Sequence, residues 1–228
     1  MNETVIRPIA RFESDFPEKF GIPRQAGVVE ALRGRVVFEP AWRSDDALRG
    51  IEGFSHLWLI WQFSENLREH YAPTVRPPRL GGNERVGVFA TRSPFRPNAL
   101  GLSCVRLLGL ERTADRGTVL LVGGADLMDG TPIFDVKPYL PYADAHSEAK
   151  GGFAPDAGET LTVEIAPASL EKIPPDKREA LRGVLENDPR PRYHDDGERV
   201  YAMSFAGLTV RFRVSEGTLC VTEVEETT

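Results

Sequence analysis

An acidic, a basic and a phenolic side chain alternate along one predicted strand. Asp135, Lys137 and Tyr139 are each separated by one residue, so an extended chain points all three to the same face. A carboxylate, an amine and a phenol on one face resemble an acid–base cluster. Spacing alone favours the alternative, an ion pair between Asp135 and Lys137 on a solvated face with Tyr139 as a packing residue.

Arginines gather in one segment of a chain whose overall charge is negative. The formal net charge is -6, from 28 Lys and Arg against 34 Asp and Glu, which argues against nonspecific coating of nucleic acid. Between residues 75 and 100, five arginines accompany a single acidic residue, Glu84: Arg76, Arg79, Arg85, Arg92 and Arg96. Guanidinium groups bind carboxylate or phosphate through paired hydrogen bonds. The alternative is a solvated loop with no ligand.

The sequence TRSPFRPN, residues 91–98, concentrates this signal between two predicted strands. Two prolines, Pro94 and Pro97, stiffen the loop and hold Arg92 and Arg96 at a low cost in conformational entropy. We expect the loop to present guanidinium groups to an anionic ligand.

Several common catalytic motifs are missing from the sequence. The four histidines lack the spacing of metal ligands, and there is no GxSxG nucleophile elbow. Neither a GxGxxG nor a P-loop pattern occurs. These observations count against zinc hydrolysis, serine-triad chemistry, dinucleotide oxidoreduction and P-loop phosphoryl transfer, and we expect no metal.

Short strands dominate the elements predicted for the first 165 residues. Eight β-branched or apolar segments are separated by Gly and Pro clusters: Val5–Phe12, Arg35–Phe38, His56–Phe63, Arg85–Ala90, Leu100–Gly109, Thr118–Gly123, Pro132–Tyr139 and Thr160–Ile165. Their spacing leaves no room for repeated crossover helices. A β-barrel is therefore expected, and a doubly wound Rossmann sheet is not.

The pattern changes from about residue 166. A helix with one apolar face is predicted over Pro175–Glu186, and strand-like runs follow at Arg199–Phe205, Thr209–Val214 and Thr218–Val224. We therefore expect a mainly β protein, with a barrel domain of residues 1–165 and a small α+β domain of residues 166–228.

Composition bears on the cellular location. No apolar run approaches the roughly 18 to 20 residues that span a bilayer, and the N-terminus lacks a basic-then-apolar signal pattern. Two cysteines are too few for a disulfide framework. These features predict a cytoplasmic protein that is not inserted in a membrane.

Six segments occur in an order that resembles one known family. They are PRQAG (23–27), GFSHLW (53–58), RPPRLGG (76–82), the TRSPFRPN loop, DGTPIFDVKPYLPYAD (129–144) and DPRPRY (188–193). This order resembles the TrmO/TsaA (YaeB-like) family over nearly the whole chain. The resemblance implies an S-adenosylmethionine-dependent tRNA methyltransferase built on a β-barrel, usually a homodimer. Its substrate would be N6-threonylcarbamoyladenosine at tRNA position 37, beside the anticodon of threonine tRNA, methylated at N6.

The resemblance also implies the positions of a cofactor site. They are Pro23, Arg24, Gln25, Arg92, Leu102, Asp129, Gly130, Thr131 and Pro132. Ser64 and Glu65 correspond to two further cofactor contacts, where the family pattern has a His-Gln pair. Glu65 would still accept a hydrogen bond from a ribose hydroxyl or from the cofactor's ammonium.

The implied reaction needs a general base. The acceptor nitrogen is conjugated to both the purine and a carbamoyl group, so its proton should leave as the new bond forms. Asp135 is the first candidate base and Tyr139 the second, with Lys137 holding the carboxylate or stabilising developing negative charge. The alternative is that these residues only organise the pocket.

The implied substrate suggests further binding residues. Its threonyl carboxylate would pair with Arg96, or with Arg76 or Arg79. The anticodon stem and loop would be gripped through phosphate contacts and stacking by Lys177, Arg178, Arg182, Arg190, Arg192 and Tyr193. An ordinary solvated helix face is the alternative, because acidic residues lie nearby.

Two rival functions stay open at this point. The first is a noncatalytic module that binds a nucleotide-like ligand and regulates a partner. The second is a methyltransferase with the same cofactor that acts on another acceptor.

Overall fold

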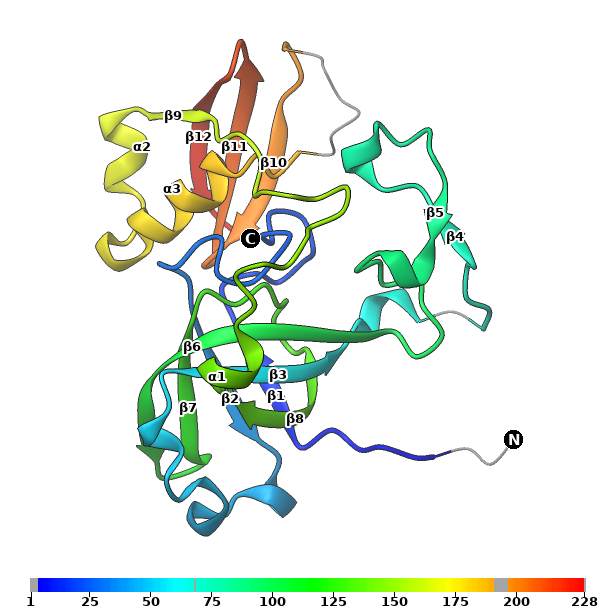
Figure 1. Ribbon diagram of the computed structural model, residues 1–228. Helices are drawn as coiled ribbons and strands as arrows, with labels where there is room; N and C mark the ends of the chain where they lie inside the picture. The colour runs from blue at the N-terminus through cyan, green and yellow to red at the C-terminus, as the bar shows by residue number, and fades with distance from the viewer. Residues whose placement is uncertain (1–3, 68, 191–196, 228) are drawn as a thin grey trace.

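Six strands of the N-terminal region form a closed barrel (Figure 1). The computed structural model describes residues 4–67, 69–190 and 197–227. In spatial order the barrel strands are β1 (Ala10–Glu13), β2 (Arg33–Phe38), β7 (Gly117–Gly123), β6 (Leu100–Thr113), β3 (His56–Gln62) and β8 (Pro132–Pro138). The sheet closes because β1 pairs antiparallel with both β2 and β8, although the β1–β8 seam has only two residue pairs.

Alternation along β3 separates the barrel interior from its outer face. Leu57, Leu59 and Trp61 are buried inside, and the residues between them are partly exposed. Gly101 of β6 lies directly opposite Trp61, and a Cβ there would lie 2.3 Å from the indole Cε2. Glycine at position 101 therefore allows the tryptophan ring to pack flat against β6.

A second sheet lies at the other end of the molecule, with two helices beside it (Figure 1). Its strand order is β10 (Tyr201–Phe205), β11 (Leu208–Ser215), β12 (Thr218–Glu226) and β9 (Thr162–Ile165). The helices are α2 (Pro167–Glu171) and α3 (Arg178–Glu186). The apolar face of α3 packs into a core with the strands through Ala180, Leu181, Val184 and Leu185. The predicted mainly β fold is confirmed.

Three strand predictions need correction. Strand β9 does not join the barrel but pairs parallel with β12, because a four-residue alternation does not specify which sheet a strand enters. Residues 85–90 do not form a barrel strand either: β5 (Val86–Gly87) pairs only with β4 (Thr74–Val75) in a hairpin that projects from the body (Figure 1). The first strand begins at Ala10 rather than at residue 5.

Short helical turns connect the strands. One α-helical turn, α1, covers Pro141–Asp144. The 3₁₀ turns lie at Pro40–Trp42, Asp45–Leu48, Ile51–Gly53, Ser64–Asn66, Pro78–Leu80, Val88–Ala90 and Pro175–Lys177. The last of these occupies the first turn of the helix predicted from residue 175, so α3 itself begins three residues later. None of the helices in the described parts of the chain is long and apolar enough to span a membrane.

The two sheets share packing through the chain after β1. Phe16, Val29 and Leu32 are buried in the core of the second sheet. Lys177, just before α3, donates to both carboxylate oxygens of Asp15 at 2.6 and 2.8 Å. The division into domains of residues 1–165 and 166–228 stays a prediction, and the pairing of β9 favours a boundary before residue 162.

Candidate functional site

Two segments of the implied cofactor site meet through a hydrogen bond. Arg92, in the TRSPFRPN loop, donates from Nη1 to Oε1 of Gln25. Both side chains keep solvent access, Gln25 being partly exposed and Arg92 exposed. Neighbouring Pro23 is buried and Arg24 is exposed, with its guanidinium donating to the Arg190 carbonyl at 3.3 Å.

A carboxylate that the sequence analysis did not select, Asp126, lies at the same place. It accepts a hydrogen bond from Ser103 Oγ at 2.6 Å and another from the Ala26 backbone. Burial raises the pKa of Asp126 above its usual value, while the hydrogen bonds and the nearby charge of Arg92 act in the opposite direction. The only sequence signal for Asp126 was a single carboxylate three residues after the apolar strand that ends at Gly123.

The turn of residues 129–132 is fixed against β1. Its backbone donates from Asp129 to the Phe16 carbonyl at 2.9 Å and from Gly130 to the Phe12 carbonyl at 2.8 Å. Gly130 has a φ of 74°, a conformation that favours glycine. Asp129 and Gly130 are exposed, whereas Thr131 and Pro132 are buried. The Thr131 hydroxyl donates to the Met128 carbonyl at 2.7 Å.

Ser64 and Glu65 open a 3₁₀ turn directly after β3. Glu65 is exposed, and its carbonyl accepts a hydrogen bond from Lys19 Nζ at 3.1 Å. The preceding Phe63 donates from its backbone to the Ala99 carbonyl at 2.9 Å. The turn therefore lies beside the end of the TRSPFRPN loop.

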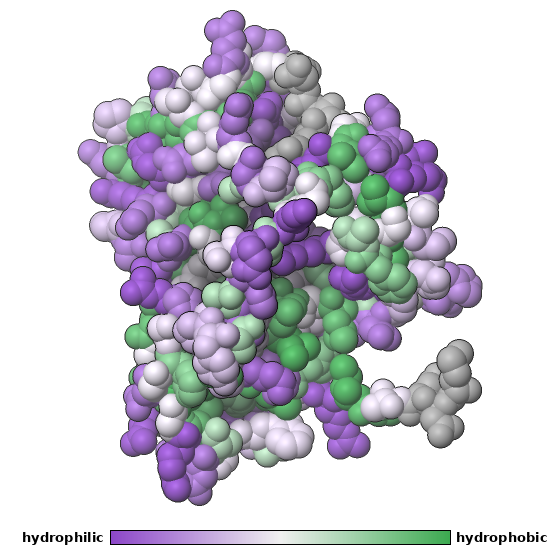
Figure 2. Space-filling model, in the orientation of Figure 1, coloured by the Kyte–Doolittle hydropathy of each residue, from purple (hydrophilic) through white to green (hydrophobic). Residues whose placement is uncertain are grey.

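Leu102 connects the implied cofactor residues with the outer face of the barrel. It is 56% exposed and lies opposite Ile60 on β3, which in turn lies opposite Asp135 on β8. Directly paired residues share a face, and neighbouring strands are about 4.8 Å apart. Leu102, Ile60 and Asp135 therefore form a row on the outer face. Figure 2 shows hydrophobic residues at the visible surface over the barrel.

The three predicted catalytic residues lie together on that outer face. The carboxylate of Asp135 is 3.2 Å from Lys137 Nζ, and both side chains are substantially exposed. The ring of Tyr139 lies 6.0 Å from that of His56 and 5.9 Å from that of Trp58. The geometry contains the ion pair and the packing contacts of the simpler interpretation, and it leaves the Asp135 carboxylate accessible.

A cavity of about 220 Å³ lies beside the TRSPFRPN loop. Arg96 lines it, together with polar and aromatic side chains that include Gln62, Tyr71, Phe95 and Asn98. The other two candidate arginines are elsewhere: the guanidinium of Arg79 is 3.7 Å from the carboxylate of Asp156, and Arg76 is exposed near the β4–β5 hairpin.

The cationic residues predicted to grip RNA make contacts within the chain. Arg178 and Arg182 donate to backbone carbonyls of Ile173 and Val163, each at 3.0 Å. Arg190 forms a two-bond pair with Asp188, at 2.8 and 3.0 Å, and Lys177 pairs with Asp15 as described above. Arg192 and Tyr193 lie outside the described residues.

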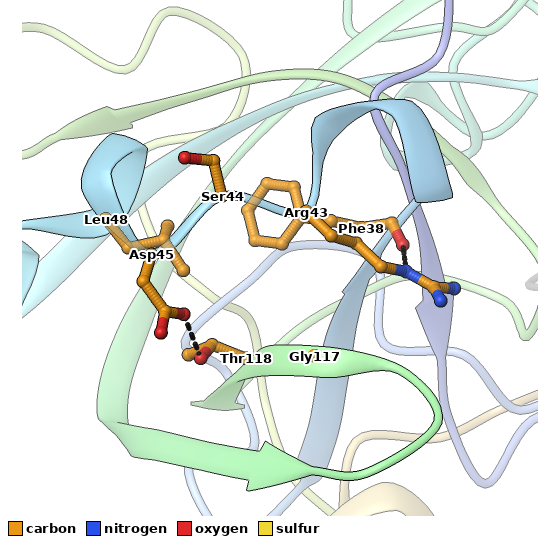
Figure 3. A pocket seen from close by; sticks show the side chains of 7 residues that line it. All are labelled: Phe38, Arg43, Ser44, Asp45, Leu48, Gly117 and Thr118. Atoms are coloured by element: carbon orange, nitrogen blue, oxygen red, sulfur yellow. Dashed lines mark hydrogen bonds between the residues drawn. The ribbon is translucent and has the colours of Figure 1, made fainter.

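A larger cavity, of about 310 Å³, contains none of the predicted site residues (Figure 3). Thr118 donates to Asp45 at 2.6 Å, and Arg43 Nε donates to the Phe38 carbonyl at 2.8 Å. This cavity adds no residue to the candidate site. Within residues 4–67, 69–190 and 197–227, no cluster of three His, Cys, Asp or Glu side chains is arranged to hold a metal ion.

Comparisons with known proteins agree with this organisation. The family model described as the tRNA-methyltransferase O N-terminal domain matches residues 11–145, and that of the TrmO C-terminal domain matches residues 158–227. A tRNA (adenine(37)-N6)-methyltransferase of Escherichia coli is 40% identical over 225 residues, covering 95% of both chains. RcsF of Pseudomonas aeruginosa, named as an S-adenosylmethionine-dependent methyltransferase, is 42% identical over 82% of both chains.

The fold comparison leads to the same family. The crystal structure of TrmO from Pseudomonas aeruginosa superposes with a TM-score of 0.79 at 32% identity and covers 99% of each chain. The two family models thus match consecutive parts of the chain, and the Escherichia coli relative matches nearly its whole length. This chain belongs to the TrmO family.

Proposed function

We propose that this chain is an S-adenosylmethionine-dependent tRNA methyltransferase that methylates N6 of N6-threonylcarbamoyladenosine at position 37 of threonine tRNA. The observation that carries the proposal is the match to the TrmO family over both of its domains. The hydrogen bond between Arg92 and Gln25 supports it, because two segments of the implied cofactor site meet there.

Residues of the implied cofactor site suit S-adenosylmethionine chemically. The exposed guanidinium of Arg92 matches a carboxylate, and the carboxylate of Asp129 can accept hydrogen bonds from an ammonium or ribose hydroxyl. Oδ1 of Asp129 accepts a hydrogen bond from the Ser14 backbone at 3.0 Å. When bound, S-adenosylmethionine supplies an electrophilic methyl group on a sulfonium.

Asp135 is the proposed base for the N6 proton. Its carboxylate shares the outer barrel face with Leu102, about two strand spacings away. Lys137, 3.2 Å from the Asp135 carboxylate, is proposed to hold that carboxylate in place or to stabilise negative charge that develops on the substrate. Tyr139 is the second candidate, and a purely organising role for all three residues is the alternative.

Arg96 is the proposed partner of the threonyl carboxylate. It lines the 220 Å³ cavity with three amide side chains, Gln62, Asn66 and Asn98, which offer hydrogen bonds to hydroxyl and carbamoyl groups. Aromatic rings in the same cavity suit stacking of an unpaired base. Arg79 has an acidic partner in Asp156, so Arg96 is favoured over it.

The reaction can be tested directly. Purified protein and labelled S-adenosylmethionine are incubated with threonine tRNA that either carries or lacks the threonylcarbamoyl group, and the digested nucleosides are identified by mass. We expect methyl incorporation only into the modified adenosine. Cofactor binding without incorporation would favour the noncatalytic module, and a methylated nucleoside of another kind would favour a different acceptor.

The same assay tests the arginine assignment. Arg96→Ala should reduce methylation of the modified tRNA and lower discrimination against unmodified tRNA, because the carboxylate loses its partner. Arg79→Ala is the matched control and should retain discrimination. An equal loss on both RNAs after Arg96→Ala would contradict a specific carboxylate contact.

Three further assignments belong to this proposal. We propose that the protein is cytoplasmic and forms a homodimer. Gel filtration coupled to light scattering would measure its molar mass and so test the dimer. The tRNA anticodon stem-loop is its proposed partner. Arg178, Arg182 and Arg190 stay proposed contacts, and substitution of any true phosphate contact should reduce the salt dependence of tRNA binding.

A further inference from the structure

Three segments that are distant in sequence meet at the carboxylate of Asp126. The Ala26 backbone and Ser103 Oγ donate hydrogen bonds to it, and the positive charge of Arg92 acts on it from nearby. Ala26 directly follows Gln25, and Ser103 directly follows Leu102. The hydrogen bonds from Ala26 and Ser103 therefore come from the immediate neighbours of two implied cofactor residues, and the nearby charge belongs to a third.

The turn of residues 129–132 is a fourth segment, joined to Asp126 by the backbone. Asp126 lies three residues before the turn that begins at Asp129. That turn is held against the chain around β1 by two backbone hydrogen bonds. Displacement of Asp126 would therefore change the relative positions of all four segments.

A buried hydrogen-bond chain fixes the carboxylate. Trp61 Nε1 donates to Ser103 Oγ at 2.9 Å, and Ser103 Oγ donates to Asp126 Oδ1 at 2.6 Å. Ser103 is 2% exposed and Trp61 is 7% exposed, so water does not compete for either donor. Hydrogen bonds to a charged acceptor in such surroundings are stronger than those on the surface.

The buried position of the Asp126 carboxylate is unfavourable for folding. Burial raises the pKa of Asp126, which means that its environment disfavours the ionised form. The neighbours Ala125 and Leu127 are buried hydrophobic residues. An amide would keep an acceptor oxygen for Ser103 without burying a charge, so the carboxylate is better explained by its effect on Arg92 and on the adjoining segments.

We propose that Asp126 is a positioning residue of the cofactor site, whose carboxylate orients Arg92 and holds the segments of Ala26 and Ser103 in the arrangement that binds S-adenosylmethionine. The inference rests on the cofactor named in the proposed function. It concerns a residue that is hydrogen-bonded to the neighbours of Gln25 and Leu102 and lies near the charge of Arg92, and it does not require direct contact with the cofactor.

The test measures ligand affinity by isothermal titration calorimetry on the full chain, together with the melting temperature. The ligands are S-adenosylmethionine and S-adenosylhomocysteine, which differ in the transferred methyl group and in the positive charge on sulfur. Asp126→Asn retains the size of the side chain and an acceptor oxygen for Ser103 but removes the charge. Asp46→Asn, at an exposed carboxylate, is the matched control.

We expect Asp126→Asn to weaken both ligands by a similar factor, about tenfold, within the range of coupling between contacting residues. The melting temperature should stay close to that of the unmutated chain, since a costly buried charge has been removed. Asp46→Asn should leave both affinities unchanged.

Three outcomes would overturn the inference. Unchanged affinities in Asp126→Asn would mean that Asp126 does not position the site, even if the melting temperature falls. A loss confined to S-adenosylmethionine would mean that the carboxylate acts directly on the sulfonium. No binding by the unmutated chain would overturn the proposed cofactor and, with it, this inference.

Ser103→Ala keeps the inference testable if Asp126→Asn does not fold. It removes the hydrogen bond to Asp126 and leaves every proposed cofactor-binding residue in place. We expect both ligands to bind about threefold more weakly, and unchanged affinities would contradict the proposal.

Discussion

Replacement of Gly101 by alanine should destabilise the barrel by forcing Trp61 to move. The added Cβ would lie 2.3 Å from Cε2, 2.5 Å from Cζ2 and 2.6 Å from Cδ2 of the indole. Nonbonded carbon atoms prefer separations of about 3.5 to 4.0 Å, so the ring has to shift by about 1 Å. Trp61 is buried in the barrel core, where surrounding side chains leave no space for this shift.

The magnitude follows from two effects. Overpacking of a core costs about 1 to 3 kcal/mol. The shift also breaks the 2.9 Å hydrogen bond from Trp61 Nε1 to Ser103 Oγ, and a buried donor without a partner costs about 1 to 3 kcal/mol more. Together these effects predict a decrease of about 2 to 6 kcal/mol in the free energy of unfolding.

Urea denaturation followed by tryptophan fluorescence measures this quantity. Gly53→Ala is the control, because a Cβ at position 53 meets nothing within 4 Å, and it should change the free energy by less than about 0.5 kcal/mol. A decrease below about 1 kcal/mol for Gly101→Ala would refute the assigned clash with Trp61.

Three other substitutions test separate parts of the structure by the same measurement. Lys177→Met removes the partner of Asp15, and since these side chains are only 25% and 16% exposed, the free energy of unfolding should fall by about 1 to 3 kcal/mol. Leu181→Ala removes a side chain that is 0% exposed and should cost about 2 to 5 kcal/mol. Hydrogen bonds, chiefly from the Leu140 backbone and then from Trp58, lower the pKa of Asp144. A lowered folded pKa stabilises the protein above the unfolded pKa, so Asp144→Asn should be less stable at neutral pH, and its difference from the unmutated chain should disappear as the pH falls through that lowered pKa.

Controls and opposing results are specific to each substitution. Lys150→Met, at an exposed lysine, should leave the free energy of unfolding unchanged. A decrease equal to that of Lys177→Met would show that Lys177 acts through its charge alone and not through its pairing with Asp15. Leu108→Ala, at a residue that is 41% exposed, should cost clearly less than Leu181→Ala. A stability difference for Asp144→Asn that persists in strong acid would contradict the assigned ionisation.

Local sequence patterns were sufficient to predict strand β3 and helix α3. The apolar and aromatic run of residues 56–63 predicted a strand, and β3 covers His56–Gln62. The apolar residues of α3 repeat with the period of a helix, as the predicted apolar face requires, and Ala180, Leu181, Val184 and Leu185 are buried. These properties depend only on neighbours in sequence.

Pairing between distant strands was not determined by the same patterns. Residues 162–165 alternate as a barrel strand would, yet they pair with β12. Residues 86 and 87 pair with β4 in a separate hairpin. Alternation specifies which side of a strand is apolar, while the choice of partner depends on where the connecting segments lead the chain.

For the site, the sequence by itself determined which segments carry unusual chemistry. The arginines and prolines of TRSPFRPN and the family order of motifs identified the loops and the implied cofactor. Only the tertiary structure placed Arg92 against Gln25, 67 positions away, and brought Asp126 to Ser103 and the Ala26 backbone. Side-chain types are local properties of the chain, whereas a hydrogen bond between distant residues exists only after the barrel closes and fixes both ends.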